Sequence, residues 1–178
     1  LAAIVLFKAG IHTELPIFLD DAGNSSHLLN FFVTLLWVTA ITNAINIIDV
    51  MDGLATGTAM IAALFLFTIA IFVGDDPVVP FMAMVLAGAL LGFLRFNSRP
   101  AKIFLGDTGS LFIGFMLGAL TMLVSYSGQN GRLALLTPIV LLAIPLFDTV
   151  FVAWHRARRG LPVFRGSPDH FALRLVRD

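Results

Sequence analysis

The chain has 178 residues, of which 58% are hydrophobic and only 12% are charged, and its mean hydropathy is +0.95. These values exclude an ordinary soluble domain and indicate a membrane protein. The formal net charge is zero, so no overall basic field would attract nucleic acid. The sequence contains no cysteine, which excludes disulfides, thiol nucleophiles and cysteine metal sites within it.

The chain begins at Leu1 rather than at a methionine, and residues 1–7 resemble the tail of an apolar span. We therefore expect the beginning of this span to lie upstream, in a longer protein. A cleaved signal peptide is the rival explanation. The start shows neither a basic n-region nor a small-residue cleavage site, which favours the first interpretation.

Five further stretches approach or reach the length of about 20 mostly apolar residues that a membrane helix needs. They are Leu28–Ile48, Leu54–Val73, Val78–Leu94, Leu111–Tyr126 and Leu133–Trp154. Backbone polar groups inside a bilayer must be satisfied within their own segment, so we predict helices. The predicted fold is all-α, a polytopic membrane bundle of five full transmembrane helices plus the tail of a sixth. Residues 1–178 form one integral membrane domain, with a basic tail at 155–178.

Two pairs of glycines in these stretches have the spacing small-xxx-small. They are Gly88 with Gly92, and Gly114 with Gly118. In membranes this spacing lets helix backbones approach each other closely. We therefore expect all four glycines to lie at contacts between helices.

Basic residues are distributed unequally between the two sets of loops that alternate along the predicted spans. One set holds Arg95, Arg99, Lys102, Arg156, Arg158, Arg159, Arg165, Arg174 and Arg177. The other set holds only Lys8 and Arg132, together with the acidic residues Glu14, Asp20, Asp21, Asp75 and Asp76. Since positive residues concentrate in cytoplasmic loops, the first set and the C-terminus are predicted to be cytoplasmic.

A first polar run follows the predicted span that ends at Ile48. It places Asn43, Asn46, Asp49 and Asp52 three residues apart and ends at Gly53. Residues three apart are neighbours on a helix, but an ideal helix would rotate the row, so we expect a tightened last turn that a glycine permits. The alternative is a solvated helix terminus with capping side chains. Two carboxylates and two amides at a membrane boundary favour a functional site.

A second polar run, Phe-Leu-Gly-Asp-Thr-Gly-Ser, occupies residues 104–110. Its two glycines free the backbone around Asp107. Exposed N–H groups at a helix start attract anions, and a carboxylate is a hard oxygen ligand suited to a Mg²⁺ ion that bridges substrate phosphates. The alternative is that a side chain of this run only caps a helix that begins at Leu111.

The last two groups of interest lie toward the C-terminus. His170 ends the run Ser-Pro-Asp-His at 167–170, after a dense group of arginines. Those arginines either anchor the chain to anionic lipid headgroups or bind a diphosphate. Asp148 lies within the last predicted span, and an ionisable group there is a candidate for function without an assigned partner.

These runs, in this order and on one predicted side, resemble the polyprenyl-phosphate N-acetylhexosamine-1-phosphate transferases of glycosyltransferase family 4. That family includes phospho-N-acetylmuramoyl-pentapeptide transferase and the WecA-type enzymes. The resemblance covers nearly the whole chain, and the first two runs are highly specific. The segments Pro145–Thr149 and Ser167–His170 look more like the WecA-type branch.

The resemblance implies site residues at matching positions. The implied catalytic residues are Asp107, Asp49, Asp52 and His170, and the implied substrate-binding residues are Asn43, Asn46, Phe104 and Arg165. Asp107 would be the Mg²⁺ ligand, with Mn²⁺ as an alternative ion, and Phe104 would stack on uracil. The first-run residues would line the nucleotide end of the pocket, and His170 would lie near the diphosphate.

The sequence departs from the family pattern in two places. Leu173 stands where a further histidine is usual three residues after His170. The family's Asp-Asp-x-x-Asp run is absent, and we expect it upstream. Asp20 and Asp21 do not replace it, because they lie in a loop on the predicted non-cytoplasmic side.

The implied reaction is the attack of a polyprenyl phosphate oxygen on the β-phosphorus of a UDP-N-acetylhexosamine, which releases UMP. N-acetylglucosamine-1-phosphate and undecaprenyl phosphate are the expected partners, in the synthesis of cell-envelope polysaccharide, lipopolysaccharide or peptidoglycan precursors. Phosphoryl transfer depends on positioning and charge neutralisation, so no protein nucleophile is required. The resemblance also implies the bacterial cytoplasmic (inner) membrane, and a homodimer is left open.

Two rival functions were weighed against this transferase. A transporter or channel would carry acidic residues near mid-membrane on broken helices, whereas most acids here lie at the predicted cytoplasmic ends. A catalytically inactive membrane assembly partner would fit a truncated chain. An upstream Asp-Asp-x-x-Asp run would favour the enzyme, and its absence would favour the partner.

Overall fold

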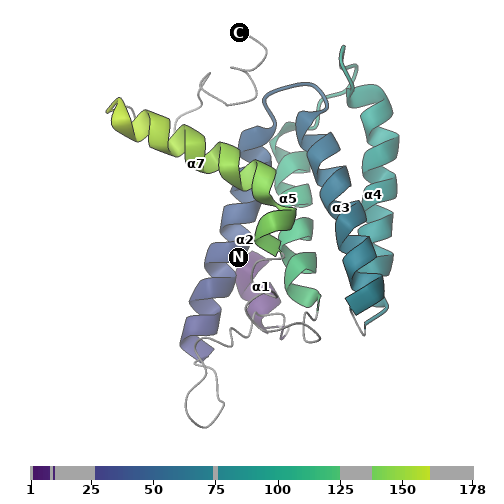
Figure 1. Ribbon diagram of the computed structural model, residues 1–178, viewed down its shortest axis with the longest axis vertical. Coiled ribbons are helices and arrows are strands. Elements are labelled where there is room, and N and C mark those ends of the chain that lie inside the picture. Colours follow the sequence, from purple (N-terminus) through teal and green to yellow (C-terminus); the bar gives the residue numbers. More distant parts are fainter. Residues whose placement is uncertain (1, 9, 11–26, 74–75, 125–137, 161–178) are drawn as a thin grey trace.

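The computed structural model describes residues 2–8, 10, 27–73, 76–124 and 138–160, and the regular structure within these ranges is helical (Figure 1). The helices are α1 (Ala2–Lys8), α2 (His27–Ile48), α3 (Leu54–Val73), α4 (Val78–Asn97), α5 (Gly106–Leu123) and α7 (Ala143–Arg158). Four of them, α2 to α5, are long and apolar enough to cross a membrane. The prediction of a polytopic membrane helical bundle is confirmed.

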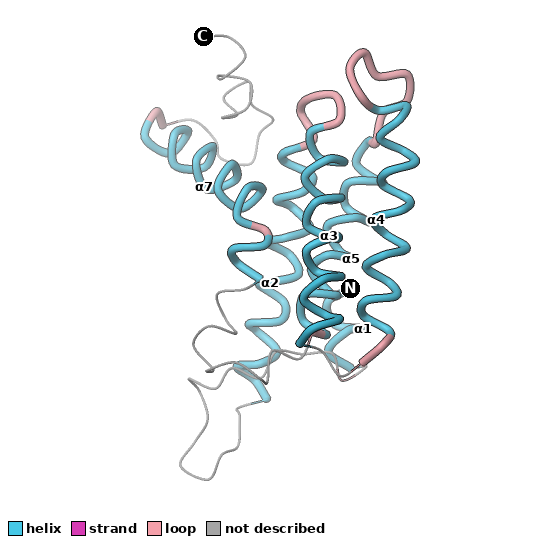
Figure 2. Tube along the Cα trace, turned by 45° about the vertical axis from the view of Figure 1, so that its right-hand side comes forward, coloured by secondary structure: helices cyan, strands magenta, loops and turns pink. Residues whose placement is uncertain are grey.

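The fifth predicted span, Leu133–Trp154, is not the single helix that its hydropathy suggests. Within the described residues the chain is helical at 138–141, turns at Leu142 and resumes as α7. Pro145 accounts for the break, because proline lacks an N–H and its ring would clash with the carbonyl of Leu141 in a continuous helix. Figures 1 and 2 show α7 lying oblique to the other helices and pointing away from the bundle, and it packs against α2.

Helices α2 and α5 approach each other through backbone atoms. A Cβ atom added at Gly114 would lie 2.7 Å from the Cα atom and 3.0 Å from the carbonyl oxygen of Thr42. At Gly118 the added Cβ would lie 3.6 Å from the Cα atom of Val38. The predicted close contacts at these two glycines are confirmed.

Helices α3 and α4 form the second extensive helix pair, but Gly88 and Gly92 make no helix contact within the described residues. A Cβ atom added at Gly88 or Gly92 would meet no atom of the described part of the chain within 4 Å, and both positions are exposed there. The buried stripe of α4 consists of Ala83, Leu86, Ala87 and Leu90. The two glycines lie outside this stripe, so their spacing alone did not place them at a contact.

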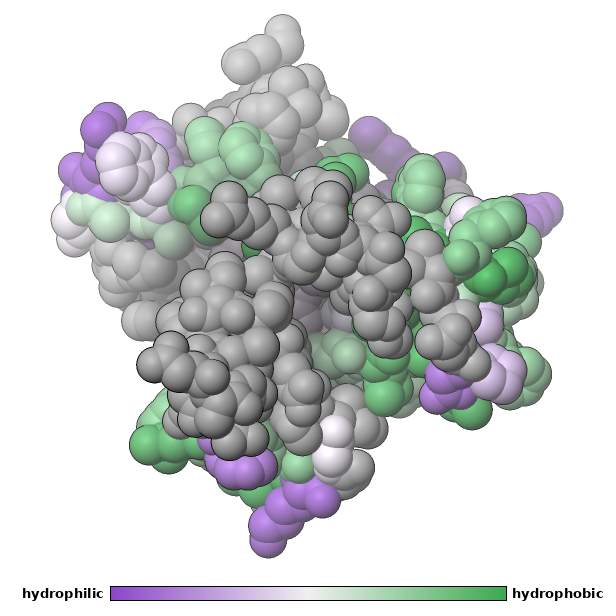
Figure 3. Space-filling model, turned by 60° about the horizontal axis from the view of Figure 1, so that its bottom comes forward, coloured by the Kyte–Doolittle hydropathy of each residue, from purple (hydrophilic) through white to green (hydrophobic). Residues whose placement is uncertain are grey.

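The sides of the bundle are apolar. Leu36 on α2 is 71% exposed, Phe72 on α3 is 82% exposed and Val140 is 71% exposed. Figure 3 shows hydrophobic residues on the outer surface of the described helices, with hydrophilic residues in smaller groups. Side chains of this kind suit contact with lipid, in agreement with a multi-pass membrane protein.

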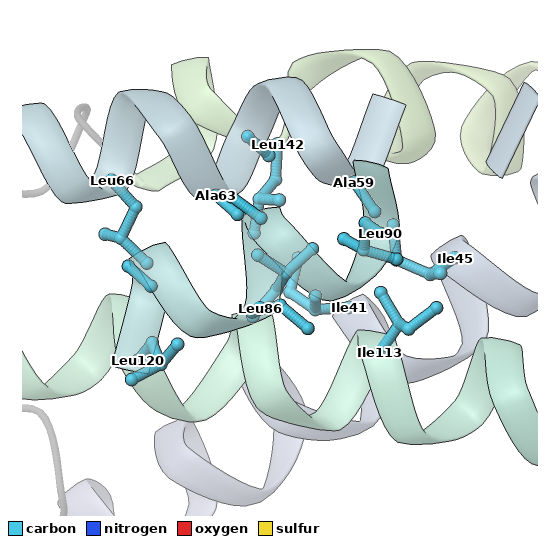
Figure 4. Packing of buried hydrophobic residues seen from close by; sticks show 14 of the residues in the cluster. Ile41, Ile45, Ala59, Ala63, Leu66, Leu86, Leu90, Ile113, Leu120 and Leu142 are labelled. Carbon is cyan, nitrogen blue, oxygen red and sulfur yellow. The ribbon is translucent and has the colours of Figure 1, made fainter. Parts of the chain in front are cut away.

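One apolar core joins α2, α3, α4 and α5 (Figure 4). Its labelled members are Ile41, Ile45, Ala59, Ala63, Leu66, Leu86, Leu90, Ile113, Leu120 and Leu142. Small alanines of α3 alternate with large aliphatic side chains of its neighbours. This packing holds the four helices in a fixed register, which determines where their ends meet.

Four helix termini gather at one end of the bundle, the upper end in Figure 1. There α2 ends at Ile48, α3 begins at Leu54, α4 ends at Asn97 and α5 begins at Gly106. At the opposite end, the carboxylate of Asp76 accepts a hydrogen bond of 2.8 Å from the backbone N–H of Val78 at the start of α4. The polar runs found in the sequence lie in the two connections at the upper end, 49–53 and 98–105, and in the adjoining turns of α2 and α5.

Candidate active site

The site centres on a contact between the two polar runs. Asn46, in the last turn of α2, donates from Nδ2 to Oδ1 of Asp107 over 3.1 Å and to Oγ of Ser110 over 2.8 Å. Ser110 is fully buried and its hydroxyl also donates to the carbonyl oxygen of Gly106 over 3.0 Å. The sequence placed the two polar runs on one face without predicting a contact between them, and in the structure Asn46 joins them. Ser110 follows Asp107 by three residues and therefore shares its side of the helix, a spacing that could have indicated its place in the site.

Helix α5 begins five residues earlier than expected, at Gly106 instead of Leu111. Gly106 has φ 65°, a conformation that suits glycine and turns the chain into the helix. Asp107 lies within the first turn, and the N-cap residue Leu105 makes no side-chain capping hydrogen bond. Asp107 is therefore not a simple cap. Its exposed carboxylate lies at the positive end of the helix, where negative charge is favoured.

Asp49 follows the last residue of α2 and faces the same region. Burial raises the pKa of its carboxyl group, and the negative charge of Asp107 raises it further. Two carboxylates that repel each other in this way would each be stabilised by a cation between or beside them. The arrangement therefore favours a positively charged ligand at the end of α2.

The carboxylates suit a Mg²⁺ site that a substrate completes, and not a site enclosed entirely by protein. Carboxylate oxygens are hard ligands, and Mg²⁺ commonly uses one or two of them together with waters and substrate phosphates. Within the described residues there is no group of three or more histidine, cysteine, aspartate or glutamate side chains that could hold a metal by themselves. Asp107 and Asp49 would thus hold an ion that the substrate diphosphate completes, as opposed to one enclosed by protein.

Asp52 joins the two polar connections. Its exposed side chain accepts a hydrogen bond at Oδ2 from the backbone N–H of Ala101 over 3.0 Å. The last turn of α2 is tightened, since Asp49 N donates to Asn46 O over 3.3 Å and Val50 N donates to Ile48 O over 2.8 Å. The tightened ending predicted for this run is confirmed.

Gly53 completes the corner that leads into α3. It has φ 75°, and an added Cβ would lie 3.4 Å from Cδ1 of Leu94. This position requires a left-handed backbone beside the end of α4, which explains the glycine. The predicted role of Gly53 in ending the run is confirmed.

Asn43 does not join the other members of its row. It is exposed, and its Nδ2 donates to the carbonyl oxygen of Thr39 in its own helix over 2.7 Å. The side-chain hydrogen bonds of Asn46 and Asp52 also lead away from the row, toward the second run and its loop. The predicted contact of Asn43 with the substrate stays a prediction.

Phe104 presents its ring to the outside of the α4–α5 connection. The residue is 74% exposed, three positions before Asp107. An aromatic ring in this position offers a face to a planar base. Two buried polar residues, Asn97 and Thr56, hold the loop that carries Phe104. Both lie outside the polar runs from which the site was predicted.

Of the remaining candidate residues, the structure describes Asp148 but not His170 or Arg165. Asp148 is buried, 4% exposed, on α7. At the other end of that helix, the guanidinium carbon of Arg158 lies 4.3 Å from the centroid of the Trp154 ring. His170 and Arg165 lie outside the described residues, so their roles stay predictions.

The chain was compared with known proteins. A family model described as glycosyl transferase family 4 matches residues 1–125. A probable undecaprenyl-phosphate N-acetylglucosaminyl 1-phosphate transferase of Bacillus subtilis is 39% identical over 146 residues, which are 81% of this chain and 40% of that protein. The phospho-N-acetylmuramoyl-pentapeptide-transferase of Clostridium kluyveri is 35% identical over 79% of this chain and 43% of its own length.

A second such transferase, from Clostridium beijerinckii, is 40% identical over 79% of this chain and 41% of its own length. The chain thus spans about two fifths of the length of these curated relatives, at 40%, 43% and 41%. The match of the family model covers well over half of the chain and includes both polar runs. The chain therefore belongs to glycosyl transferase family 4.

Proposed function

We propose that the protein containing this chain transfers N-acetylglucosamine-1-phosphate from its UDP derivative to undecaprenyl phosphate. The observation that carries the proposal is the contact of Asn46 with Asp107 and Ser110, which joins two separate polar runs at one end of a membrane bundle. The Bacillus subtilis relative is named for this transfer. An oxygen of the lipid phosphate attacks the β-phosphorus, the bond from that phosphorus to the bridging oxygen breaks, and UMP leaves with the electron pair.

The chain contributes positioning and electrostatics. Asp107 and Asp49 would hold Mg²⁺, which when bound offsets the negative charge of the diphosphate. Asn46 fixes the rotamer of Asp107 by donating to one carboxylate oxygen, so the other oxygen remains available to a ligand. The backbone N–H groups in the first turn of α5 favour an anion beside them. These contributions match a reaction in which placement and charge neutralisation lower the barrier.

The two ends of the substrate would be recognised by different parts of the site. Phe104 stacks on the uracil, and Asp107 lies three residues further along, at the diphosphate. His170 and Arg165 would reach the same diphosphate from the basic tail. This division separates residues that bind the unreactive base from those that act on the reacting phosphates.

The site would face the cytoplasm of a bacterial cell from the inner membrane. The proposal rests on the excess of basic residues at this end, including Arg95, Arg99 and Lys102. Because the sequence contains no cysteine, single introduced cysteines can report the side with an impermeant thiol reagent on intact cells. We expect Asp76→Cys to be labelled and Ser98→Cys to be protected; labelling at Ser98 would overturn the orientation.

The reaction itself is tested by UMP release from the full-length protein in detergent. We expect release with UDP-N-acetylglucosamine, undecaprenyl phosphate and Mg²⁺, and none when the lipid is omitted. Release only with UDP-N-acetylmuramoyl-pentapeptide would overturn the choice of sugar, and release with neither would overturn the transferase. The isolated 178-residue chain should bind uridine nucleotide weakly without turnover, since the longer relatives supply further residues.

A further inference from the structure

The connection between α4 and α5 folds back on the end of α4. Asn97, the last residue of α4, is 3% exposed and donates from Nδ2 to the carbonyl oxygen of Ile103 over 3.0 Å. The backbone N–H groups of Lys102 and Ile103 donate to the carbonyl oxygen of Phe96 over 2.8 Å and 3.4 Å. The loop is thus closed immediately before Phe104.

The closed loop is fastened to a different helix by one threonine. Thr56, in the first turn of α3, is fully buried, and its hydroxyl donates to Oδ1 of Asn97 over 2.7 Å. Thr58, two residues further along, instead donates to backbone carbonyls of its own helix, at 2.8 Å to Leu54 and 3.1 Å to Ala55. The Thr56 hydroxyl therefore makes a contact between helices, whereas the Thr58 hydroxyl bonds only within its own helix. Away from water such a bond is strong, and its loss leaves a buried acceptor unsatisfied.

Neither residue is placed to touch a substrate, because both are buried while the site residues Phe104 and Asp107 are exposed. They can act only through the loop. The carbonyl that Asn97 holds belongs to Ile103, one peptide unit before Phe104. Asp107, by contrast, is held by Asn46 from α2.

We propose that Thr56 and Asn97 form a buried clamp that positions Phe104 relative to Asp107, and that Thr56 is a positioning residue for nucleotide binding. The consequence for binding rests on the proposed function, whereas the clamp itself does not. Removing the Thr56 hydroxyl would loosen the loop before the aromatic ring and leave the Asn46–Asp107 contact in place. Nucleotide binding would then weaken while the reacting end of the site is kept.

The test uses three variants of the full-length protein. Thr56→Val removes the hydroxyl at nearly constant shape, Thr56→Ser keeps it, and Thr58→Val is the matched control in the same turn. Hydrogen exchange of the backbone amides at 101–104 reports the loop, and exchange at 106–113 reports the start of α5. KM for UDP-N-acetylglucosamine, kcat and the Mg²⁺ concentration for half-maximal rate report the site.

In Thr56→Val we expect faster exchange at 101–104, unchanged exchange at 106–113 and a KM raised roughly threefold to tenfold, the range of one lost hydrogen bond. The kcat and the Mg²⁺ response should be kept, because the binding lost is equal in ground and transition states. Thr56→Ser and Thr58→Val should resemble the wild type in all of these. If Thr56→Val does not fold, Thr56→Ala removes the same hydroxyl and takes its place.

Unchanged exchange at 101–104 in the hydroxyl-free variant would overturn the clamp. Faster exchange with an unchanged KM would overturn its role in nucleotide binding. If the wild type itself releases no UMP, the proposed function fails, and the exchange measurement still decides whether the clamp exists. If kcat and thermal stability fall and KM rises alike in Thr56→Val and Thr58→Val, the effect is on folding alone. This outcome would also overturn the positioning role.

Discussion

The two helix pairs of the bundle reach the same end of the molecule, yet they are held together by different means. In the α2–α5 pair, Gly114 brings backbone against backbone, and the pair ends in the contact of Asn46 with Asp107. In the α3–α4 pair, apolar side chains make the contact, and the pair ends in the hydrogen bond of Thr56 with Asn97. The α2–α5 pair thus ends in the exposed charged group of Asp107, and the α3–α4 pair ends in the buried neutral side chains of Thr56 and Asn97.

This difference indicates a division of labour. A carboxylate that holds an ion beside a reacting phosphate must keep its position closely, and a backbone contact between α2 and α5 leaves little freedom to slide. The position of Asp107 is therefore fixed by the close contact of α2 with α5. The loop with Phe104 crosses from the second pair to the first, and hydrogen bonds with Asn97 and Asp52 help to fix it. Changes in each pair should therefore fail in different measurements.

The largest expected effect is that of Asp107→Asn. Losing the negative charge removes electrostatic stabilisation at the reacting phosphates, so we expect kcat to fall roughly 100-fold to 1,000-fold. The asparagine has nearly the same shape, and Asn46 can still contact its oxygen. Binding of Mn²⁺, followed by electron paramagnetic resonance, should weaken in the same variant.

The control for this change is Asp76→Asn at the opposite end of the bundle, where the carboxylate caps the start of α4. It should retain kcat and the metal response. An Asp107→Asn enzyme that stays active and responds to Mg²⁺ as the wild type does would refute the metal assignment. In that case the carboxylate would serve only the stability of the α5 start.

The second prediction compares glycines of the two pairs. In Gly114→Ala the new Cβ would lie 2.7 Å from a backbone atom of Thr42, which cannot move aside cheaply. We expect a destabilisation of about 3 kcal/mol, the upper part of the range for overpacking. Gly88→Ala meets nothing in the described part of the chain within 4 Å and should leave stability unchanged or raise it slightly. Thermal unfolding in detergent measures both, and equal effects would contradict the proposed difference in packing.

Much of the fold could be predicted from the sequence, because long apolar runs have few alternatives in a membrane. The expected spans Leu28–Ile48 and Leu54–Val73 agree with α2 and α3 to within a residue. The start of α5 was missed because hydropathy does not register a polar first turn made of glycine, aspartate and threonine. The break before α7 was missed because an apolar run with a proline still reads as apolar.

The candidate site was only partly predictable. The shared end of the two polar runs followed from their order and the alternation of sides, whereas the contact of Asn46 with Asp107 was not predicted. The bond of Thr56 with Asn97 did not, because it depends on the rotation of α3 against α4, which hydropathy does not specify. The same reason applies to Gly88, since spacing identifies a small-residue stripe without identifying the helix that covers it.

The third prediction concerns the loop of the second pair. Phe104→Ala removes a ring that would touch only the unreactive uracil, so binding falls equally in ground and transition states. The lost stacking is worth about 2 kcal/mol, so we expect KM to rise roughly thirtyfold with kcat nearly unchanged. Phe72→Ala, which truncates another exposed ring at the far end of α3, should leave KM unchanged. A fall in kcat without a change in KM would place the ring at the reacting phosphates instead.

The smallest expected effect belongs to the last turn of α5, at the end of the α2–α5 pair away from the site. The hydroxyl of Thr121 accepts from Nε1 of Trp37 over 3.1 Å and donates to the carbonyl oxygen of Gly118 over 2.9 Å. Thr121→Val keeps the shape and removes both bonds, which should cost about 0.6 kcal/mol, the mean for hydrogen bonds between membrane helices. Thr68→Val, where the exposed hydroxyl only bonds its own helix, should change stability less. Because the backbone contact at Gly114 persists, KM and kcat should be unchanged in Thr121→Val. A raised KM in Thr121→Val would mean that the site end of this pair is not held independently of its opposite end.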